Sequence, residues 1–181
     1  MKKTLLLLPC VLALVLAASA QENLTFADLP LVSSPTLMPS GYGQLSWTNI
    51  YYVNPDQWSG AGPGYKDGPV GGILRPQDVA FVGSKVCRVL HEACFGTIGG
   101  NSLLSFQAVS AVVAGGFGPT NITVFAYNNG TYVGSAFYSL TTQMQTLNLP
   151  PSWGSITQLT FQTEAGGDLV FYDVQVYLLG G

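Results

Sequence analysis

The chain has 181 residues, of which 48% are hydrophobic, 12% aromatic and only 8% charged. This hydrophobic and aromatic content argues against disorder, and the length suits one domain with a core of its own. Without the first 20 residues, four basic side chains remain against nine acidic ones, which gives a net charge of −5. A weakly acidic chain without a basic cluster argues against nucleic acid and anionic membranes as partners.

The first 20 residues follow the order of a secretory signal peptide. Two lysines precede an apolar run over 5–17, and the tripeptide Ala18-Ser19-Ala20 offers cleavage before Gln21. An uncleaved anchor is the alternative, but the apolar run is short for a span of about 20 residues. We therefore predict a signal peptide at 1–20 and a secreted, extracellular domain at 21–181, with no membrane span in the mature protein.

The stretch from Thr25 to Val53 contains one acidic residue, Asp28, among small, aromatic and β-branched residues. Two interpretations are open: Asp28 ends a strand or caps a turn, or it binds a structural calcium ion. Hard cations take about six to eight oxygens, and β-sandwich modules use them to tie the first and last strands together. If the chain ends lie side by side, Asp28 and Asp173 of the last predicted strand would converge on such an ion.

The segment 54–72, NPDQWSGAGPGYKDGPVGG, has too much Gly and Pro for regular structure and is predicted to be a long ordered loop. Aromatic rings stack on pyranose rings while nearby amides bond the hydroxyls, so aromatic residues in and before this loop predict a sugar-binding face. Strand alternation sends Tyr51 and Tyr52 to opposite faces, and one of them belongs to the core. Trp58 and Tyr65, in the loop, are expected to be exposed.

Two cysteines, Cys87 and Cys94, remain in the predicted mature chain. An even pair in an oxidising compartment predicts one disulfide that closes a small loop. A metal site or a catalytic thiol is the alternative, but the single nearby histidine, His91, cannot complete a tetrahedral site.

The second half of the chain has the alternating pattern of strands. Strands are predicted over 103–113, 145–149 and 156–163, and a hairpin is predicted around the turn residues Asn128-Asn129-Gly130. In the closing segment LVFYDVQVYL, a strict alternation places these residues on one face: Val170, Tyr172, Val174, Val176 and Leu178. Short, regularly spaced strands without a helical pattern predict an all-β fold, an antiparallel β-sandwich in a single domain.

Three sequons fit a secreted eukaryotic chain and are candidate N-glycosylation sites: Asn23, Asn121 and Asn129. Asn129 is the best candidate of the three, because it lies at the predicted hairpin tip.

Several of these segments resemble one family. The opening TFADLPL with GYGQLSWTNIYYV is similar to the "FDDLP … GY-x-G-L-x-W-x-N-F" start of small secreted fungal proteins, which are related in pattern to bacterial PEP-CTERM-type secreted domains. LLSFQAVSAVV, ITVFAYNNGTYV and DLVFYDVQVYLL resemble further strand motifs of that family, from which Ala27 and Val174 depart. The resemblance implies a jelly-roll-like β-sandwich similar to carbohydrate-binding modules.

No catalytic constellation is recognisable. Glycoside hydrolysis usually needs two carboxylates across a cleft, and no acidic pair has a recognisable motif. A serine triad needs a histidine base, and no Gly-x-Ser-x-Gly elbow accompanies His91. We therefore predict a non-catalytic, secreted protein that binds an extracellular glycan or cell-wall polysaccharide. Two alternatives are open: a structural or effector-like protein that binds extracellular proteins, and a small polysaccharide hydrolase or lyase.

Overall fold

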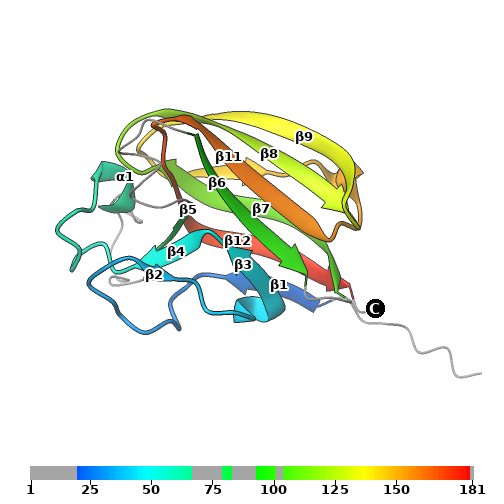
Figure 1. The fold of residues 1–181 in the computed structure, drawn as a ribbon, viewed down its shortest axis with the longest axis horizontal. Helices are drawn as coiled ribbons and strands as arrows, with labels where there is room; N and C mark the ends of the chain where they lie inside the picture. The colour runs from blue at the N-terminus through cyan, green and yellow to red at the C-terminus, as the bar shows by residue number, and fades with distance from the viewer. Residues whose placement is uncertain (1–19, 67–78, 83–92, 101–103, 180–181) are drawn as a thin grey trace, which may run out of the picture.

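Strands make up most of the described chain. The computed structural model describes residues 20–66, 79–82, 93–100 and 104–179, which form an antiparallel, jelly-roll-like β-sandwich as the sequence predicts (Figure 1). The strands, in chain order, are β1 (Ala20–Leu24), β2 (Thr36–Leu37), β3 (Leu45–Thr48), β4 (Ile50–Val53), β5 (Val79–Val82), β6 (Ala93–Gly100), β7 (Ser105–Gly115), β8 (Thr120–Asn128), β9 (Thr131–Leu140), β10 (Gln145–Asn148), β11 (Gln158–Ala165) and β12 (Leu169–Leu179).

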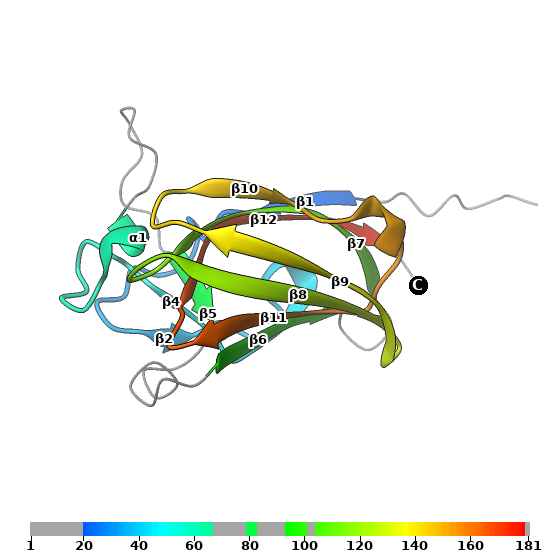
Figure 2. The same cartoon turned by 90° about the horizontal axis from the view of Figure 1, so that it is seen from above.

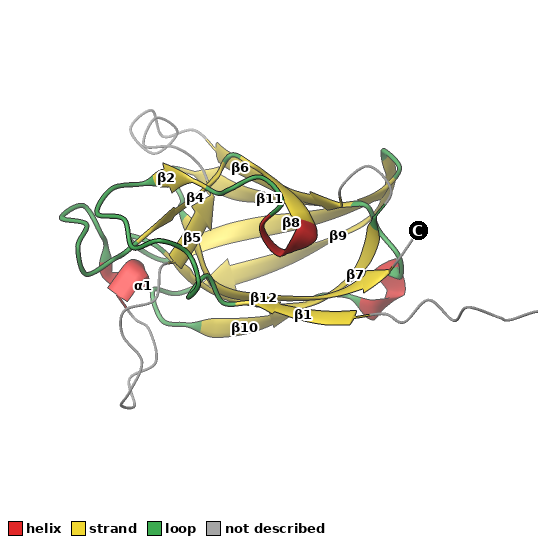
Figure 3. Cartoon of the chain, turned by 90° about the horizontal axis from the view of Figure 1, so that it is seen from below, coloured by secondary structure: helices red, strands yellow, loops and turns green. Residues whose placement is uncertain are grey.

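Helical structure is limited to short turns that lie outside the two sheets (Figure 3). They are η1 (Tyr42–Gln44), α1 (Pro63–Lys66) and η2 (Pro151–Trp153). Apart from α1, the Gly- and Pro-rich segment 54–66 has no regular structure, as predicted. No helix among the described residues is long and apolar enough to cross a membrane.

Two sheets face each other across the core (Figure 2). One has seven strands in the order β10-β7-β12-β5-β4-β2, with β1 paired to the later part of β12. The other has five strands in the order β3-β6-β11-β8-β9, and its β8–β9 pair is the predicted hairpin. Phe161 of β11 and Phe171 of β12 meet edge to face with 4.9 Å between ring centroids, so this aromatic pair joins the two sheets.

The closing strand, β12, contains a bulge. Phe171 pairs with Val113 of β7 and Asp173 pairs with the adjacent Val112, so Tyr172 is one extra residue in β12 at this point. One extra residue in a strand moves every later side chain to the opposite face.

The bulge corrects the predicted alternation of the closing strand. Phe171 before it and Val174 after it both lie in the core between the sheets, whereas Val170 and Tyr172 lie on the outer face. The prediction that Val170 and Tyr172 share a face with Val174 was therefore wrong. A second bulge, at Val109 of β7, returns the two strands to their original register.

Some predicted features lie outside the described residues. These include nearly all of the signal peptide, the loop after position 66, and Cys87. The signal peptide and the Cys87–Cys94 disulfide therefore stay predictions.

Candidate functional site

A tight turn fixes one end of the five-stranded sheet. Asn129 and Gly130 join β8 to β9 with φ angles of 49° and 76°, the left-handed conformation that a two-residue type I′ turn requires. The Asn129 N–H donates to Thr157 Oγ1 at 2.8 Å, and the Thr157 N–H donates to the Tyr127 carbonyl at 2.9 Å. These bonds hold the hairpin tip against the segment that leads into β11.

The outer face of the five-stranded sheet is polar because alternation sends the apolar residues of the same strands inward. Leu45, Ile98 and Leu159 are all completely buried in the core. Their neighbours face outward and line up across the strands through the antiparallel register. One row runs Ser46, Gly99, Gln158, Tyr127, Tyr132, and the next runs Thr48, Thr97, Thr160, Phe125, Ser135.

A groove of about 710 Å³ lies over β3, β6 and β11 at the hairpin end of this face. We call it the outer groove, and its volume is within the usual range of ligand sites, about 300–1,000 Å³. None of the described residues that line it is charged, and Leu104 has the only aliphatic side chain among them. The lining residues are Ser46, Thr48, Thr97, Gly99, Gly100, Leu104, Ser105, Asn128, Asn129, Ser155, Thr157 and Gln158.

Hydrogen bonds orient several side chains on the floor of the outer groove. Gln158 Nε2 donates to Thr160 Oγ1 at 3.1 Å, and the hydroxyls of Thr160 and Thr97 lie 3.3 Å apart. The Ser46 hydroxyl donates to the Gly99 carbonyl at 3.0 Å. Hydroxyl and amide groups can both donate and accept, so this floor is suited to a neutral ligand rich in hydroxyl groups.

Two tyrosines continue the row that passes through Gln158. Tyr127 and Tyr132 lie in a T-shaped arrangement with 6.0 Å between ring centroids, and Tyr132 is 56% exposed. An exposed ring beside hydroxyl and amide groups combines an apolar face with polar edges. This group of residues was not predicted from the sequence, because its members come from segments far apart in the chain.

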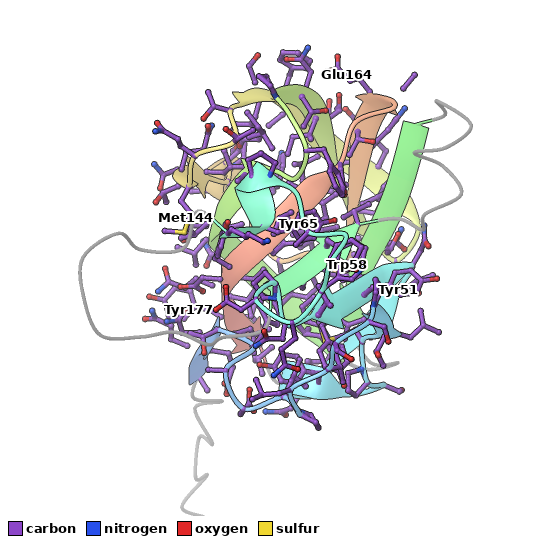
Figure 4. All side chains as sticks on the ribbon, turned by 90° about the vertical axis from the view of Figure 1, so that its left-hand side faces the viewer. Tyr51, Trp58, Tyr65, Met144, Glu164 and Tyr177 are labelled. Atoms are coloured by element: carbon purple, nitrogen blue, oxygen red, sulfur yellow. The ribbon has the colours of Figure 1, made fainter. Side chains whose placement is uncertain are left out.

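The aromatic residues predicted to bind sugar pack mainly against one another at the other end of the sandwich (Figure 4). Tyr65, Phe81, Val53 and Val170 form a second apolar cluster on the outer face of the seven-stranded sheet, under segment 54–66. We call it the loop cluster, and its partly buried members are Tyr51, Trp58, Ala61, Phe117 and Tyr172.

Tyr65 is the centre of the loop cluster and is only 1% exposed. Its ring lies 5.1 Å from that of Trp58 and 5.5 Å from that of Phe81, and its hydroxyl donates to Asp168 Oδ2 at 2.6 Å. The expectation that Tyr65 is exposed was wrong, because its ring packs on aromatic neighbours and its hydroxyl is bonded to the Asp168 carboxylate. The Tyr172 hydroxyl donates to the Gly64 carbonyl and holds α1 in place.

Tyr51 and Tyr52 lie on opposite faces of β4, as predicted. Tyr52 is buried between the sheets, so its ring is not available to a ligand. Tyr51 and Trp58 are partly exposed, but each stacks on Phe81, with centroids 5.7 Å and 6.0 Å away. One ring face of each is therefore already occupied, and a sugar-binding role for them stays a prediction.

Asp28 accepts a hydrogen bond from the Tyr42 hydroxyl at 2.8 Å. The same hydroxyl accepts from the Phe26 N–H at 3.1 Å, and the Trp47 Nε1–H donates to the Tyr42 carbonyl at 2.8 Å. Phe26 is completely buried and has a φ of 61°, a conformation that non-glycine residues seldom adopt. The aspartate of the opening motif therefore helps to fix a strained turn against η1.

Asp173 has a different partner from Asp28. With its amide in the orientation that satisfies both groups, Asn23 donates to both carboxylate oxygens of Asp173, at 2.8 Å for Oδ2. Burial raises the pKa of Asp173 above its usual value, and the hydrogen bond from Asn23 opposes that shift. Among the described residues, no three His, Cys, Asp or Glu side chains are grouped so that they could hold a metal ion. Calcium binding by Asp28 and Asp173 stays a prediction.

Comparisons with known proteins give no family assignment. No family model and no curated protein matches the chain. Among solved structures, a DUF4465 family protein from Bacteroides caccae is 13% identical with a TM-score of 0.44, covering 94% of this chain and 97% of that one. A CBM4 structure is 16% identical with a TM-score of 0.33, covering 71% and 86%. TmCBM61 in complex with β-1,4-galactotriose is 12% identical with a TM-score of 0.37, covering 79% and 95%. Each of these three TM-scores is below 0.5.

Proposed function

We propose that this protein is a secreted, non-catalytic binding protein that holds a neutral glycan in the outer groove. The observation that carries the proposal is the lining of the groove: hydroxyl and amide side chains on an ordered floor, without a charged group among the described residues. A sugar presents many hydroxyls that need partners of this kind, and a buried polar group without a partner costs about 1–3 kcal/mol.

Two further features support a neutral glycan as the ligand. The exposed Tyr132 and its neighbour Tyr127 extend the row through Gln158 and offer an aromatic surface on which a pyranose ring can stack. The net charge of −5 for the predicted mature chain disfavours acidic polysaccharides through repulsion.

A pair of carboxylates, which glycoside hydrolysis usually needs, is missing from the described lining of the groove.

The test is retention of the purified protein on a panel of insoluble neutral polysaccharides, with pectate and alginate as acidic controls. Gln158→Ala removes an amide from the groove floor and is expected to weaken binding about tenfold, because one neutral hydrogen bond contributes about 0.5–1.5 kcal/mol. Gln162→Ala is the matched control, because Gln162 lies on the same strand and faces the same way, outside the groove lining.

Three outcomes would count against the proposal. Folded protein without N-glycans that is retained on no polysaccharide would exclude a glycan as the ligand. Equal losses of binding for the two glutamine variants would exclude the outer groove as the binding site. Release of reducing ends from a retained polysaccharide would show that the protein hydrolyses its ligand and is an enzyme.

A protein partner is a second candidate function, favoured by the surface of β9. This strand is the edge of the five-stranded sheet, and it contains neither charge nor proline, which commonly protect sheet edges. Phe137 is 65% exposed there, and Val133 of the same strand is 39% exposed. Phe137→Ser should abolish co-precipitation of a protein from extracellular extract while polysaccharide retention stays unchanged. Dissociation of the complex by free sugar would contradict a protein partner.

A further inference from the structure

The three sequons differ in what holds their amide groups. Asn121 Nδ2 donates to Glu164 Oε2 at 2.9 Å, and its Oδ1 accepts from the Ser139 hydroxyl at 2.8 Å. The amide of Asn23 is bonded to the Asp173 carboxylate. N-glycosylation replaces one hydrogen of the amide nitrogen by a sugar, so at both positions it would disturb existing bonds.

Asn129 is in a different position. It is exposed at the tip of the β8–β9 hairpin, and no hydrogen bond of its side chain to another described residue is present. Its backbone is nevertheless fixed, because the N–H is bonded to Thr157 Oγ1 and the φ of 49° belongs to the type I′ turn. The side chain is therefore free to react while its root is held in place.

Asn129 also lines the outer groove, together with Asn128 and Thr157. A glycan on its amide nitrogen would start at the rim of the groove, and its flexible chain would reach over the floor. A lining of hydroxyl and amide groups also suits an attached neutral sugar, which would be present at the high effective concentration of a tethered ligand.

We propose that Asn129 carries an N-linked glycan and that this glycan controls access to the outer groove. The inference rests on the proposed glycan-binding function. In the modification, Asn129 Nδ2 attacks the anomeric carbon of an oligosaccharide on a lipid diphosphate. The new C–N bond forms as the bond from that carbon to the diphosphate oxygen breaks, and the amide gives up one proton. The attached sugar then excludes an external polysaccharide from the groove.

The experiment compares the full chain with two sequon variants, all secreted from a eukaryotic host. Thr131→Ala destroys the Asn129 sequon without changing a residue of the groove lining, and Thr123→Ala destroys the Asn121 sequon as the matched control. Peptide masses give the occupancy of each asparagine. Retention on a neutral polysaccharide gives the apparent affinity, and thermal melting confirms that each variant is folded.

We expect high occupancy at Asn129 and lower occupancy at Asn23 and Asn121. Thr131→Ala should bind the polysaccharide at least about tenfold more tightly than the full chain, and Thr123→Ala should bind like the full chain. Enzymatic removal of the N-glycans should reproduce the gain.

Each contrary result has its own meaning. An unmodified Asn129 overturns the modification, whatever the binding data show. A modified Asn129 with equal affinities for the full chain and Thr131→Ala overturns the control of access. Folded Thr131→Ala that is retained on no polysaccharide overturns the proposed function together with the control of access, while the peptide masses still decide the modification.

Discussion

The loop cluster and the outer groove lie at opposite ends of the sandwich, near α1 and near the β8–β9 hairpin tip respectively (Figure 1). The first contains three aromatic residues that are close together in the chain, Tyr51, Trp58 and Tyr65, and they pack in one cluster with aromatic residues from distant segments. The second is assembled from short polar segments that are far apart in the chain. The contrast shows that aromatic residues close together in a sequence can indicate packing and not a binding site. A polar site can be formed by residues that no sequence motif marks.

The largest expected effect is a loss of stability, without a loss of binding, when the loop cluster is disrupted. Tyr65→Ala removes a buried ring that contacts Trp58 and Phe81, so unfolding should cost about 3–5 kcal/mol less. Denaturant unfolding measures this loss, and polysaccharide retention by the protein that is still folded should stay unchanged. Tyr65→Phe, which keeps the ring and loses the bond to Asp168, should lower the free energy of unfolding by about 1–2 kcal/mol. A specific loss of binding without a loss of stability would return the site to the loop cluster.

Two glycines of β6 test whether the outer groove binds the ligand. A Cβ at Gly99 would point into the outer groove and meet only the Ser46 hydroxyl closely, at 2.8 Å, a group that can turn away. Gly99→Val is therefore expected to reduce polysaccharide binding about tenfold with a change in unfolding free energy below about 1 kcal/mol.

Gly96 is the matched control on the same strand. A Cβ there would meet Ile50 and Val82 in the core at 2.9 Å, so Gly96→Ala should destabilise the fold by about 1–3 kcal/mol without a specific loss of binding. The same behaviour from both glycine variants would contradict the assignment of the two faces.

The Asp28–Tyr42 pair predicts a smaller, pH-dependent effect. Burial raises the pKa of the Tyr42 hydroxyl above its usual 10, and the hydrogen bond to Asp28 raises it further. The fold therefore favours the protonated phenol, and this contribution to stability is complete below pH 10 and is lost as the pH rises above 10. Melting temperatures should fall more steeply above pH 10 for the native chain than for Tyr42→Phe. Parallel curves for the two proteins would show that this hydroxyl is not responsible.

The smallest expected effect concerns calcium. A bound ion would raise stability with its concentration, but Asp28 and Asp173 each already accept a hydrogen bond from a different side chain. If calcium binds there as predicted, the melting temperature should be slightly higher in millimolar calcium than in EDTA. A rise in calcium that Asp28→Asn or Asp173→Asn abolishes would establish the ion at these residues.

Much of the fold could be predicted from the sequence, because alternation and turn residues act locally. The hairpin at Asn129-Gly130 and the opposite faces of Tyr51 and Tyr52 follow from such rules. The bulge at Tyr172 could not be predicted, since its alternation pattern also fits an unbroken strand. The floor of the outer groove depends on register: Gln158 reaches its position only through β11's pairing with β6 and β8. Tyr65 was misplaced for a related reason, because its partner Asp168 is 103 positions away.

The two bulges between β7 and β12 also bear on how the chain can change length. Phe171 pairs with Val113 on one side of them and Val176 pairs with Ala108 on the other, so both strands use five steps to cross the interval. The surplus residue on one strand, Tyr172, is matched by the surplus residue on its neighbour, Val109. Losing one alone would slide part of the sheet by a residue, whereas losing both would leave the strand ends where they are. Homologues of this protein should therefore have both extra residues, at the positions of Tyr172 and Val109, or neither.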